Sequence, residues 1–76
     1  MLDDLTALGL TRRQAEVLRL VAMGRSDQDA AAALGIAVRT AQKHLELCYR
    51  VLGVSGRSQA ARLAWDATDD HAGPEK

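Results

Sequence analysis

Apolar residues recur at helical spacing in four stretches of the chain, and glycines separate most of these stretches. Thr11 opens the first stretch and Gln14 follows three positions later, which is the T-x-x-Q pattern of a capping box at a helix start. Gly24 is a natural stop, because glycine accepts the left-handed backbone that ends many helices. The pattern predicts a helix over 12–23 whose buried face consists of Val17, Leu18 and Val21.

A short second helix is predicted over 27–34. Ser26 with Asp29 repeats the N-cap pattern, and Gly35 is the next stop. Alanine fills the second half of this helix, from Ala30 to Ala33. Such short side chains leave little to keep a neighbouring helix at a distance, so we expect a close helix crossing here.

A third helix is predicted over 38–52, ending at Gly53. One apolar seam runs along it at spacings of 4, 3 and 4 residues, through Ala41, Leu45, Cys48 and Leu52. The opposite side is polar and carries Arg39, Gln42, Lys43, Glu46 and Arg50.

A fourth helix is predicted to begin with Ser55 or Ser58 as its cap and to run to about 67. Its main apolar residues are Leu63, Ala64 and Trp65. The fold class is therefore all-α, with a tri-helical core and a fourth helix over 8–67, an N-terminal lead-in over 1–7 and a flexible acidic tail over 68–76.

Composition supports this class and narrows the setting. The 76 residues include no Phe, one Trp and one Tyr, which favours close-packed helices over a β-sandwich. Cys48 is the single cysteine and cannot form an internal disulfide. No apolar run approaches the length of a membrane span and no signal sequence follows Met1, so we expect a soluble, cytoplasmic protein without membrane contact.

The formal net charge of zero hides a gradient along the chain. Within 37–62, Glu46 is the single acidic residue, whereas the cations are Arg39, Lys43, Arg50, Arg57 and Arg62. Positive charge is therefore concentrated in one block, although a net charge of zero is unusual for a nucleic-acid binder.

Two helices joined by a short turn with glycine, the second carrying a basic polar face, are typical of a helix-turn-helix. The stretch from Leu10 to Leu18 reads LTRRQAEVL and resembles the L-T-x-R-E-x-E-V-L opening of the LuxR-type DNA-binding domain. The resemblance covers about residues 8–66. Further matches in register are Gly24, Ser26, Ala31, Leu34, Ile36, Thr40, His44, Leu52, Gly53, Val54, Arg57 and Ala60.

This resemblance implies a four-helix domain that binds double-stranded DNA as a transcriptional regulator. Its third helix would enter the major groove, and its fourth would mediate homodimerisation. Thr40 and His44 match family positions that hold phosphates or the start of the recognition helix. Several positions depart from the family pattern, and since each lost cation removes a phosphate contact, we expect weak binding by an isolated monomer. The departures are Asp27-Gln28, Ala37, Gln42 and Val51.

The candidate DNA contacts follow from side-chain chemistry. Arg39 and Lys43 suit phosphates or guanine edges, and the amide of Gln42 suits a bidentate contact with adenine. Glu46 either accepts from cytosine N4 or repels the DNA backbone, and we favour repulsion. The predicted DNA-binding set is Ser26, Gln28, Arg39, Thr40, Gln42, Lys43, His44, Glu46 and Arg50.

The predicted dimerisation surface comprises Ala61, Arg62 and Trp65 on the fourth helix. Trp65 has two open interpretations, either as a cover of the core or as an anchor in the dimer interface.

Other classes of function are less well supported. His44 and Cys48 lie four residues apart, but so small a bundle has no evident substrate cleft, so we expect no enzyme and no small-molecule substrate. A metal site would join those two residues to His71 in the tail, and we expect no metal or other cofactor. Cys48 is predicted to be a buried, small apolar side chain.

The rival interpretation is a helix-turn-helix-shaped protein-interaction module with weak or lost DNA binding, which the missing cations and the zero net charge favour. No sensor domain of about 120 residues fits in the chain. We therefore expect the C-terminal output domain of a larger regulator, the alternative being a free-standing one.

Overall fold

The computed structural model describes residues 2–67, and within this range every regular element is a helix, as the all-α class predicts. The predicted tail over 68–76, with His71, lies outside the described residues. The helices are α1 (Leu2–Thr6), α2 (Arg12–Ala22), α3 (Asp27–Leu34), α4 (Val38–Leu52) and α5 (Arg57–Ala67). The four predicted helices correspond to α2 through α5.

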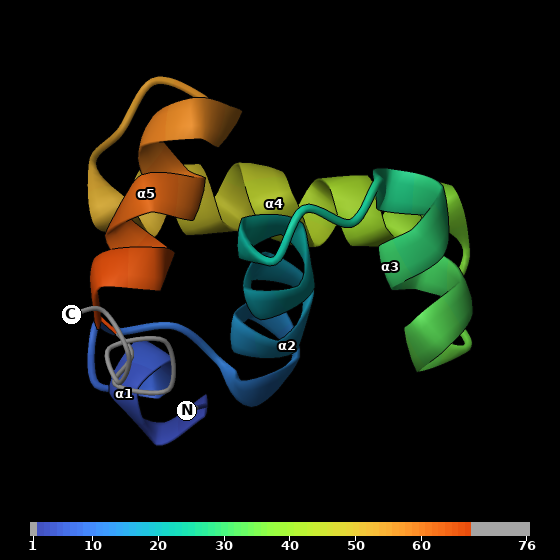
Figure 1. Ribbon diagram of the computed structural model, residues 1–76, viewed down its shortest axis with the longest axis horizontal. Helices are drawn as coiled ribbons and strands as arrows, with labels where there is room; N and C mark the ends of the chain where they lie inside the picture. Colours follow the sequence, from blue (N-terminus) through green and yellow to red (C-terminus); the bar gives the residue numbers. More distant parts are fainter. Residues whose placement is uncertain (1, 68–76) are drawn as a thin grey trace, which may run out of the picture.

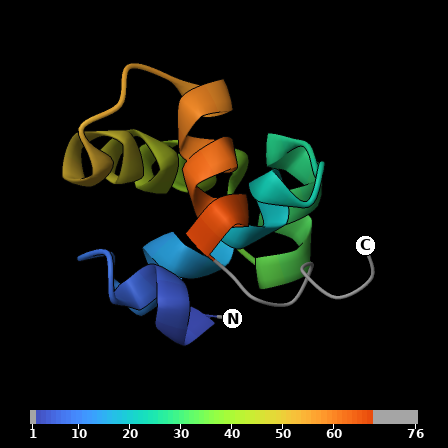
Figure 2. The ribbon, with the colours of Figure 1, turned by 60° about the vertical axis from the view of Figure 1, so that its left-hand side comes forward.

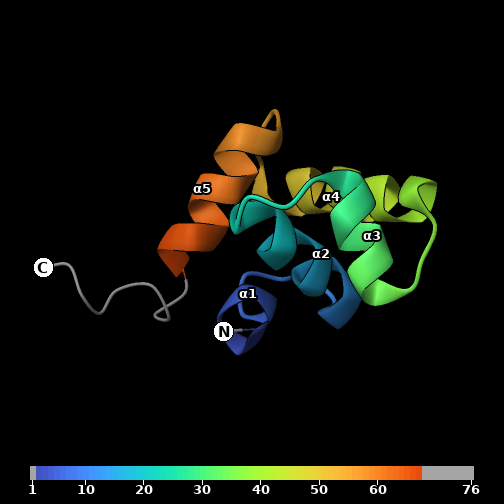
Figure 3. The same cartoon turned by 45° about the vertical axis from the view of Figure 1, so that its right-hand side comes forward.

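Helix α4 is the longest and runs along the long axis of the molecule (Figure 1). Its first turns lie beside α3 and its last turns lie toward α5, with α2 packed against its middle. In the two turned views α5 runs down from the loop that follows α4 toward α1 (Figures 2 and 3). Helices α3 and α4 thus form the helix-turn-helix, and α2 and α5 pack against it.

The predicted helix starts at Thr11 and Ser26 are confirmed. The Thr11 hydroxyl oxygen accepts from the Gln14 backbone N–H at 3.1 Å, and the Gln14 side-chain oxygen accepts from the Thr11 N–H at 3.0 Å, which completes the capping box. At the start of α3 the Ser26 hydroxyl accepts from the Asp29 N–H at 3.0 Å. Helix α2 ends at Ala22, one residue before the predicted end, because Met23 forms the cap.

Gly35 and Gly53 end α3 and α4 as predicted. Both adopt the left-handed conformation, with φ of 68° and 70°. A side chain with a Cβ is disfavoured in this region, so glycine allows each helix to end and the chain to turn away at this residue.

The cap predicted for the last helix was wrong in its details. Helix α5 begins at Arg57, so Ser58 lies inside it rather than before it. Ser55 instead binds the side chain of Gln59, donating from its hydroxyl at 3.0 Å and from its backbone N–H at 2.9 Å. Neither serine is therefore the N-cap: Gly56 directly precedes α5, and its carbonyl accepts from the Ala60 N–H at 3.1 Å.

The predicted lead-in over 1–7 carries a helix that the sequence pattern did not indicate. Helix α1 is five residues long, and its Leu5 is fully buried in the core. Five residues are too few to show a helical period, and an isolated helix of this length is unstable in water. Burial of Leu5 against the rest of the core therefore stabilises α1.

The apolar seams are mostly confirmed. Val17, Leu18 and Val21 of α2 are buried, as are Ala41, Leu45 and Cys48 of α4, whereas Leu52 is half-buried.

The alanine-rich helix α3 is only partly enclosed. Its Ala30 and Ala31 are buried, but Ala32 and Ala33 face outward. In α5 the burial falls on Ala60 and Ala64. Small residues thus provide the inward faces of both helices.

Candidate nucleic-acid interface

A charged stripe lies along the outward side of α4. Its members follow one another at spacings of 4, 3 and 4 residues, which places them on one face opposite the buried seam. All are exposed, and their cations have no ion-pair partner among residues 2–67. We call this set the α4 stripe; it consists of Arg39, Lys43, Glu46 and Arg50.

Several other cations are already paired. Arg12 and Arg13 both lie against Glu16 within α2, at 3.6 and 3.1 Å. Arg57 pairs with Asp27 at 2.5 Å. Because a paired cation gives up an intramolecular contact when it binds a phosphate, the α4 stripe is better suited to DNA than these three arginines.

One carboxylate joins the two helices of the helix-turn-helix to α5. Asp27, the first residue of α3, accepts from Arg57 through Oδ1, and the same guanidinium donates to the Arg25 carbonyl at 3.2 Å. The other oxygen of Asp27, Oδ2, accepts from the Gln42 amide at 3.3 Å. We call these contacts the Asp27 network.

The Asp27 network favours the charged form of its central carboxyl. The hydrogen bond from Arg57 is the main cause of the lowered pKa of Asp27, partial burial opposes it, and the Gln42 amide and the Arg57 charge lower it further. Asp27 therefore remains an anion at neutral pH. No local pattern in the sequence indicates this network, since Gln42 and Arg57 lie 15 and 30 positions from Asp27.

The structure brings most of the predicted DNA-binding residues together on α4 and beside it. Thr40 and Gln42 are exposed on the two flanks of the α4 stripe. Ser26 and Gln28 are exposed at the start of α3, with the Ser26 hydroxyl engaged in the helix cap. Gln42 differs from the stripe in that its amide nitrogen is bound to Asp27.

His44 lies apart from this exposed group. Its side chain is half-buried, and its Nδ1 is enclosed without a hydrogen-bond partner among the described residues. Any contact with DNA would therefore have to come from Nε2.

The predicted dimerisation residues share one flank of α5. Arg62 and Trp65 are exposed, the latter at 44 %, while Ala61 is half-buried against the core. Such exposure places Trp65 at the surface rather than inside the core.

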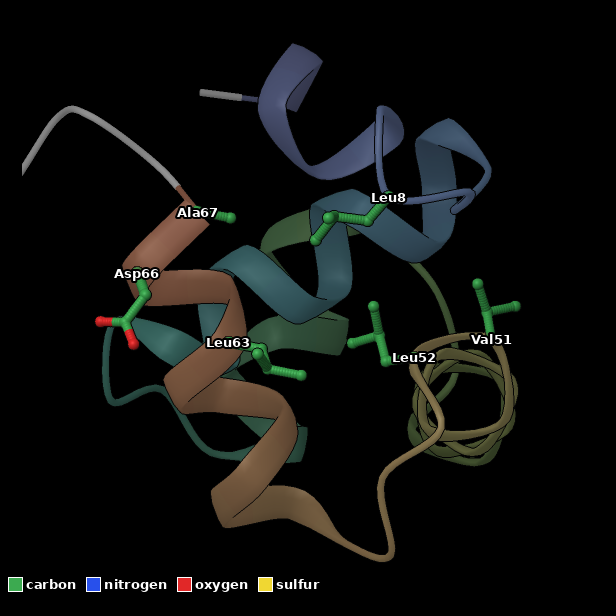
Figure 4. A pocket seen from close by; sticks show the side chains of 6 residues that line it. All are labelled: Leu8, Val51, Leu52, Leu63, Asp66 and Ala67. Atoms are coloured by element: carbon green, nitrogen blue, oxygen red, sulfur yellow. The ribbon is translucent and has the colours of Figure 1, made fainter.

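The opposite flank of α5 borders an open apolar groove. Leu8, Leu52 and Leu63 converge on it from the loop after α1, the end of α4 and α5, with Val51 at its edge (Figure 4). The groove has a volume of about 410 Å³ and is mostly apolar. Its lining has no cation, so it does not suit a phosphate backbone.

Cys48 has the character predicted for it. It is fully buried, and its Sγ donates weakly to the Gln14 carbonyl at 3.5 Å. Burial raises the pKa of the Cys48 thiol to about 11, which keeps it protonated and unreactive. Over residues 2–67 the structure has no group of three or more metal-ligating side chains.

Comparison with known proteins assigns the chain to a family. The sequence profile of the bacterial regulatory proteins of the luxR family matches residues 8–64. The chain belongs to the LuxR family. This confirms the resemblance drawn from the 10–18 segment and supports DNA binding in transcription regulation as the function of the domain.

Curated relatives of this LuxR-family domain carry names of regulators. The putative HTH-type transcriptional regulator YhjB of Escherichia coli is 43 % identical over 54 residues, and the uncharacterized transcriptional regulatory protein YhcZ of Bacillus subtilis is 42 % identical over 55. These matches cover 71 and 72 % of the chain but only 27 and 26 % of the relatives.

A shorter relative is matched over more of its length. The spore germination protein GerE of Bacillus subtilis is 37 % identical over 51 residues, which are 67 % of the chain and 69 % of GerE. No solved structure gives a significant match. None of the described helices is long and apolar enough to cross a membrane.

Proposed function

We propose that this domain binds specific sites in double-stranded DNA by placing α4 in the major groove. The observation that carries the proposal is the α4 stripe, whose cations are exposed and unpaired within the described part of the chain. An α-helix fits the width of the major groove, and phosphate contacts by Arg or Lys on its sides supply most of the affinity.

The residues of α4 would make different contacts with DNA, according to the chemistry of each side chain. Arg39 and Arg50 stand near the two ends of the helix, where they reach the flanking phosphates. Lys43 lies between them and reaches phosphate or a guanine edge. Glu46 opposes binding to the backbone, and Gln42 faces the bases from one flank.

The test is duplex binding by the purified domain over a range of salt concentrations. If α4 neutralises about three phosphates, the logarithm of the binding constant falls linearly with the logarithm of salt, with a slope of about −3. Fluorescence anisotropy on a random duplex of about 25 base pairs measures this slope.

The same experiment separates the proposal from its rival. A helix-turn-helix-shaped protein-interaction module with weak or lost DNA binding would show little or no duplex binding at low salt and no steep salt dependence. The zero net charge of the chain favours that rival, because long-range attraction to DNA is weak without a positive field. Absence of binding at low salt would overturn the proposal.

We propose further that the domain forms a homodimer on DNA through the flank of α5 that carries Ala61, Arg62 and Trp65. A single α4 covers only a few base pairs with few cations, so a useful affinity requires two copies on adjacent half-sites. The exposed indole of Trp65 is of the kind that anchors interfaces. Two-fold pairing would place the α4 helices about 34 Å apart, one turn of DNA.

A matched pair of variants tests the dimer. Trp65→Ala and Leu63→Ala remove side chains of similar exposure, 44 and 42 %, from opposite flanks of α5. We expect Trp65→Ala to weaken assembly on a duplex with two half-sites, measured by sedimentation, and Leu63→Ala to leave it intact. One domain per duplex at saturation, or a loss with Leu63→Ala alone, would refute this interface.

A further inference from the structure

We propose that Asp27 is a positioning residue for base recognition: its carboxylate fixes the Gln42 amide so that Gln42 selects adenine. This inference rests on the proposed function, since it concerns what α4 reads once it lies in the major groove. It assigns a role to a residue that lies on α3 rather than on the recognition helix.

The contact itself determines which end of the amide faces inward. Gln42 Nε2 lies 3.3 Å from Asp27 Oδ2. An ionised carboxylate can only accept hydrogen bonds, whereas an amide has a donating and an accepting end. The nitrogen of Gln42 must therefore face Asp27, and the carbonyl Oε1 must face away from it.

The carboxylate is held in place by groups on other elements. Arg57 Nη1 donates to Asp27 Oδ1, and Arg57 Nη2 donates to the Arg25 carbonyl at 3.2 Å. The Ser26 cap fixes the backbone at the same helix start. A carboxylate bound at one oxygen by a guanidinium and anchored to a capped helix cannot easily turn away from Gln42.

The groups that remain on Gln42 match one base edge. One of its two amide protons is used by Asp27, which leaves Oε1 and the second proton. Adenine presents a donor at N6 and an acceptor at N7 in the major groove, so it satisfies both. Guanine presents two acceptors there, thymine presents O4 and cytosine presents the N4 donor, so each of them satisfies only one of the two groups left on Gln42.

A free glutamine at this position would behave differently. Its amide can rotate by 180° and offer its nitrogen to guanine or thymine as readily as its oxygen to adenine. The Asp27 network thus converts an ambiguous side chain into a selective one.

The contact could instead serve only to tie α3 to α4, and the two roles make different predictions. A purely structural tie stabilises the fold and affects all DNA sequences equally. A positioning role changes the preference at one base pair and leaves the phosphate contacts, and hence the salt slope, unchanged.

The experiment measures duplex binding by the intact chain and by Asp27→Ala, Gln42→Ala and the double variant. The base pair read by Gln42 is located first, as the position whose preference disappears in Gln42→Ala. At that position we expect the unmodified chain to prefer adenine over guanine about tenfold. Asp27→Ala should reduce this to less than about twofold, and the double variant should behave like Gln42→Ala.

Three results would contradict the inference. Preference for guanine at that position, or full retention of the adenine preference in Asp27→Ala, would overturn the role of Asp27 while DNA binding stands. The lack of binding to any duplex at low salt would overturn the proposed function and this inference together.

A measurement on the free protein covers the case in which Asp27→Ala does not fold. Asp27→Asn keeps the size of the side chain but can donate as well as accept, so the Gln42 amide loses its fixed direction. In nitrogen-15 NMR spectra the two Gln42 amide protons should differ more in chemical shift in the unmodified chain than in Asp27→Asn. Identical shifts in the two proteins would refute the contact.

Discussion

The two helices of the helix-turn-helix are held in opposite ways. Helix α3 has eight residues and local anchors at both ends, with the Ser26 cap and two acidic residues in its first turn and left-handed Gly35 at its close. Its buried side chains are only Ala30 and Ala31. Aspartates near a helix N-terminus interact favourably with the helix dipole, so α3 depends largely on its termini.

Helix α4 has almost none of these anchors at its start. Its N-cap is Ala37, which makes no side-chain hydrogen bond, and no acidic residue stands in its first turn. The seam of Ala41, Leu45 and Cys48 holds the helix against the core instead.

Because of this difference, the residues that stabilise α4 are not the ones that would contact DNA. Because α4 is stabilised from its inward side, its outward side chains need no partners within the domain. Its α4 stripe can therefore change without unfolding the protein, while the termini of α3 set the position of the whole motif. The predictions below address this division.

The largest effect is expected from Leu45→Ala. Leu45 is 3 % exposed in the α4 seam, and truncating a buried leucine costs about 2–5 kcal/mol of unfolding free energy. Val51→Ala is the control on the same helix, since Val51 is 46 % exposed. Urea unfolding should show a large loss for the first variant and little change for the second.

Leu52→Ala should be milder, at about 1 kcal/mol, because Leu52 is only half-buried. This revises the expectation from the seam pattern alone, which treated both leucines alike.

Equal stability of Leu45→Ala and the unmodified chain would mean that the inward face of α4 has been assigned wrongly.

The next effect concerns Arg39→Ala and Lys43→Ala. Each should weaken duplex binding for all sequences and reduce the salt slope by about one unit, because one phosphate contact is lost. The melting temperature should not change, since both residues are exposed and unpaired within 2–67. Arg12→Ala, which removes a cation paired within α2, is the control and should bind like the unmodified chain.

Unchanged affinity in both Arg39→Ala and Lys43→Ala would remove α4 from the DNA interface. Altered affinity in Arg12→Ala would show instead that paired cations also contribute.

Much of the fold was predictable because its signals are local. A capping box spans four residues, a glycine stop needs one, and the α4 seam repeats within a single helix. The α4 stripe follows from the same periodicity. These features depend on near neighbours in the chain, so their patterns can be read without knowing the tertiary structure.

The features that the sequence did not predict depend on contacts between residues that are distant in the chain. Helix α1 forms because Leu5 finds a place in a core built by later segments. The role of Asp27 depends on Arg57 and Gln42, which only the packing of α4 and α5 brings close. The sequence marked Asp27 only as a departure from the family pattern, and it marked Gln42 as a lost cation whose amide suits adenine, but it did not link the two residues.

Ser26→Ala tests the local anchoring of α3. The loss of the hydrogen bond to the Asp29 N–H should reduce stability by about 1 kcal/mol. Ser58→Ala is the matched control, because Ser58 is an exposed serine inside α5. Thermal melts of the two variants should differ clearly, and equal melting temperatures would show that the cap contributes little.

Ala37→Ser makes the opposite change at the start of α4. A serine at this N-cap can accept from a free backbone N–H, so we expect a gain of about 0.5–1 kcal/mol. Ala33→Ser, at an exposed position inside α3, is the control and should be neutral or slightly destabilising. No gain from Ala37→Ser would indicate that the first turn of α4 is already satisfied in another way.

The smallest effect is the acid response of the Asp27 network. The folded protein lowers the pKa of Asp27 below its ordinary value of 3.8, so folding favours the charged carboxylate. The stabilisation of the fold by this carboxylate is fully present above the ordinary pKa. It is lost as the pH falls from there through the lower pKa of the folded protein. The pair is partly exposed, with Arg57 at 43 %, so solvent screening limits the contribution to less than about 1 kcal/mol. Between about pH 6 and pH 3 the unmodified chain should lose slightly more unfolding free energy than Asp27→Asn, which has no carboxylate to protonate. Urea titrations at both ends of this range measure the difference, and parallel losses in the two proteins would show that the charge of Asp27 does not stabilise the fold.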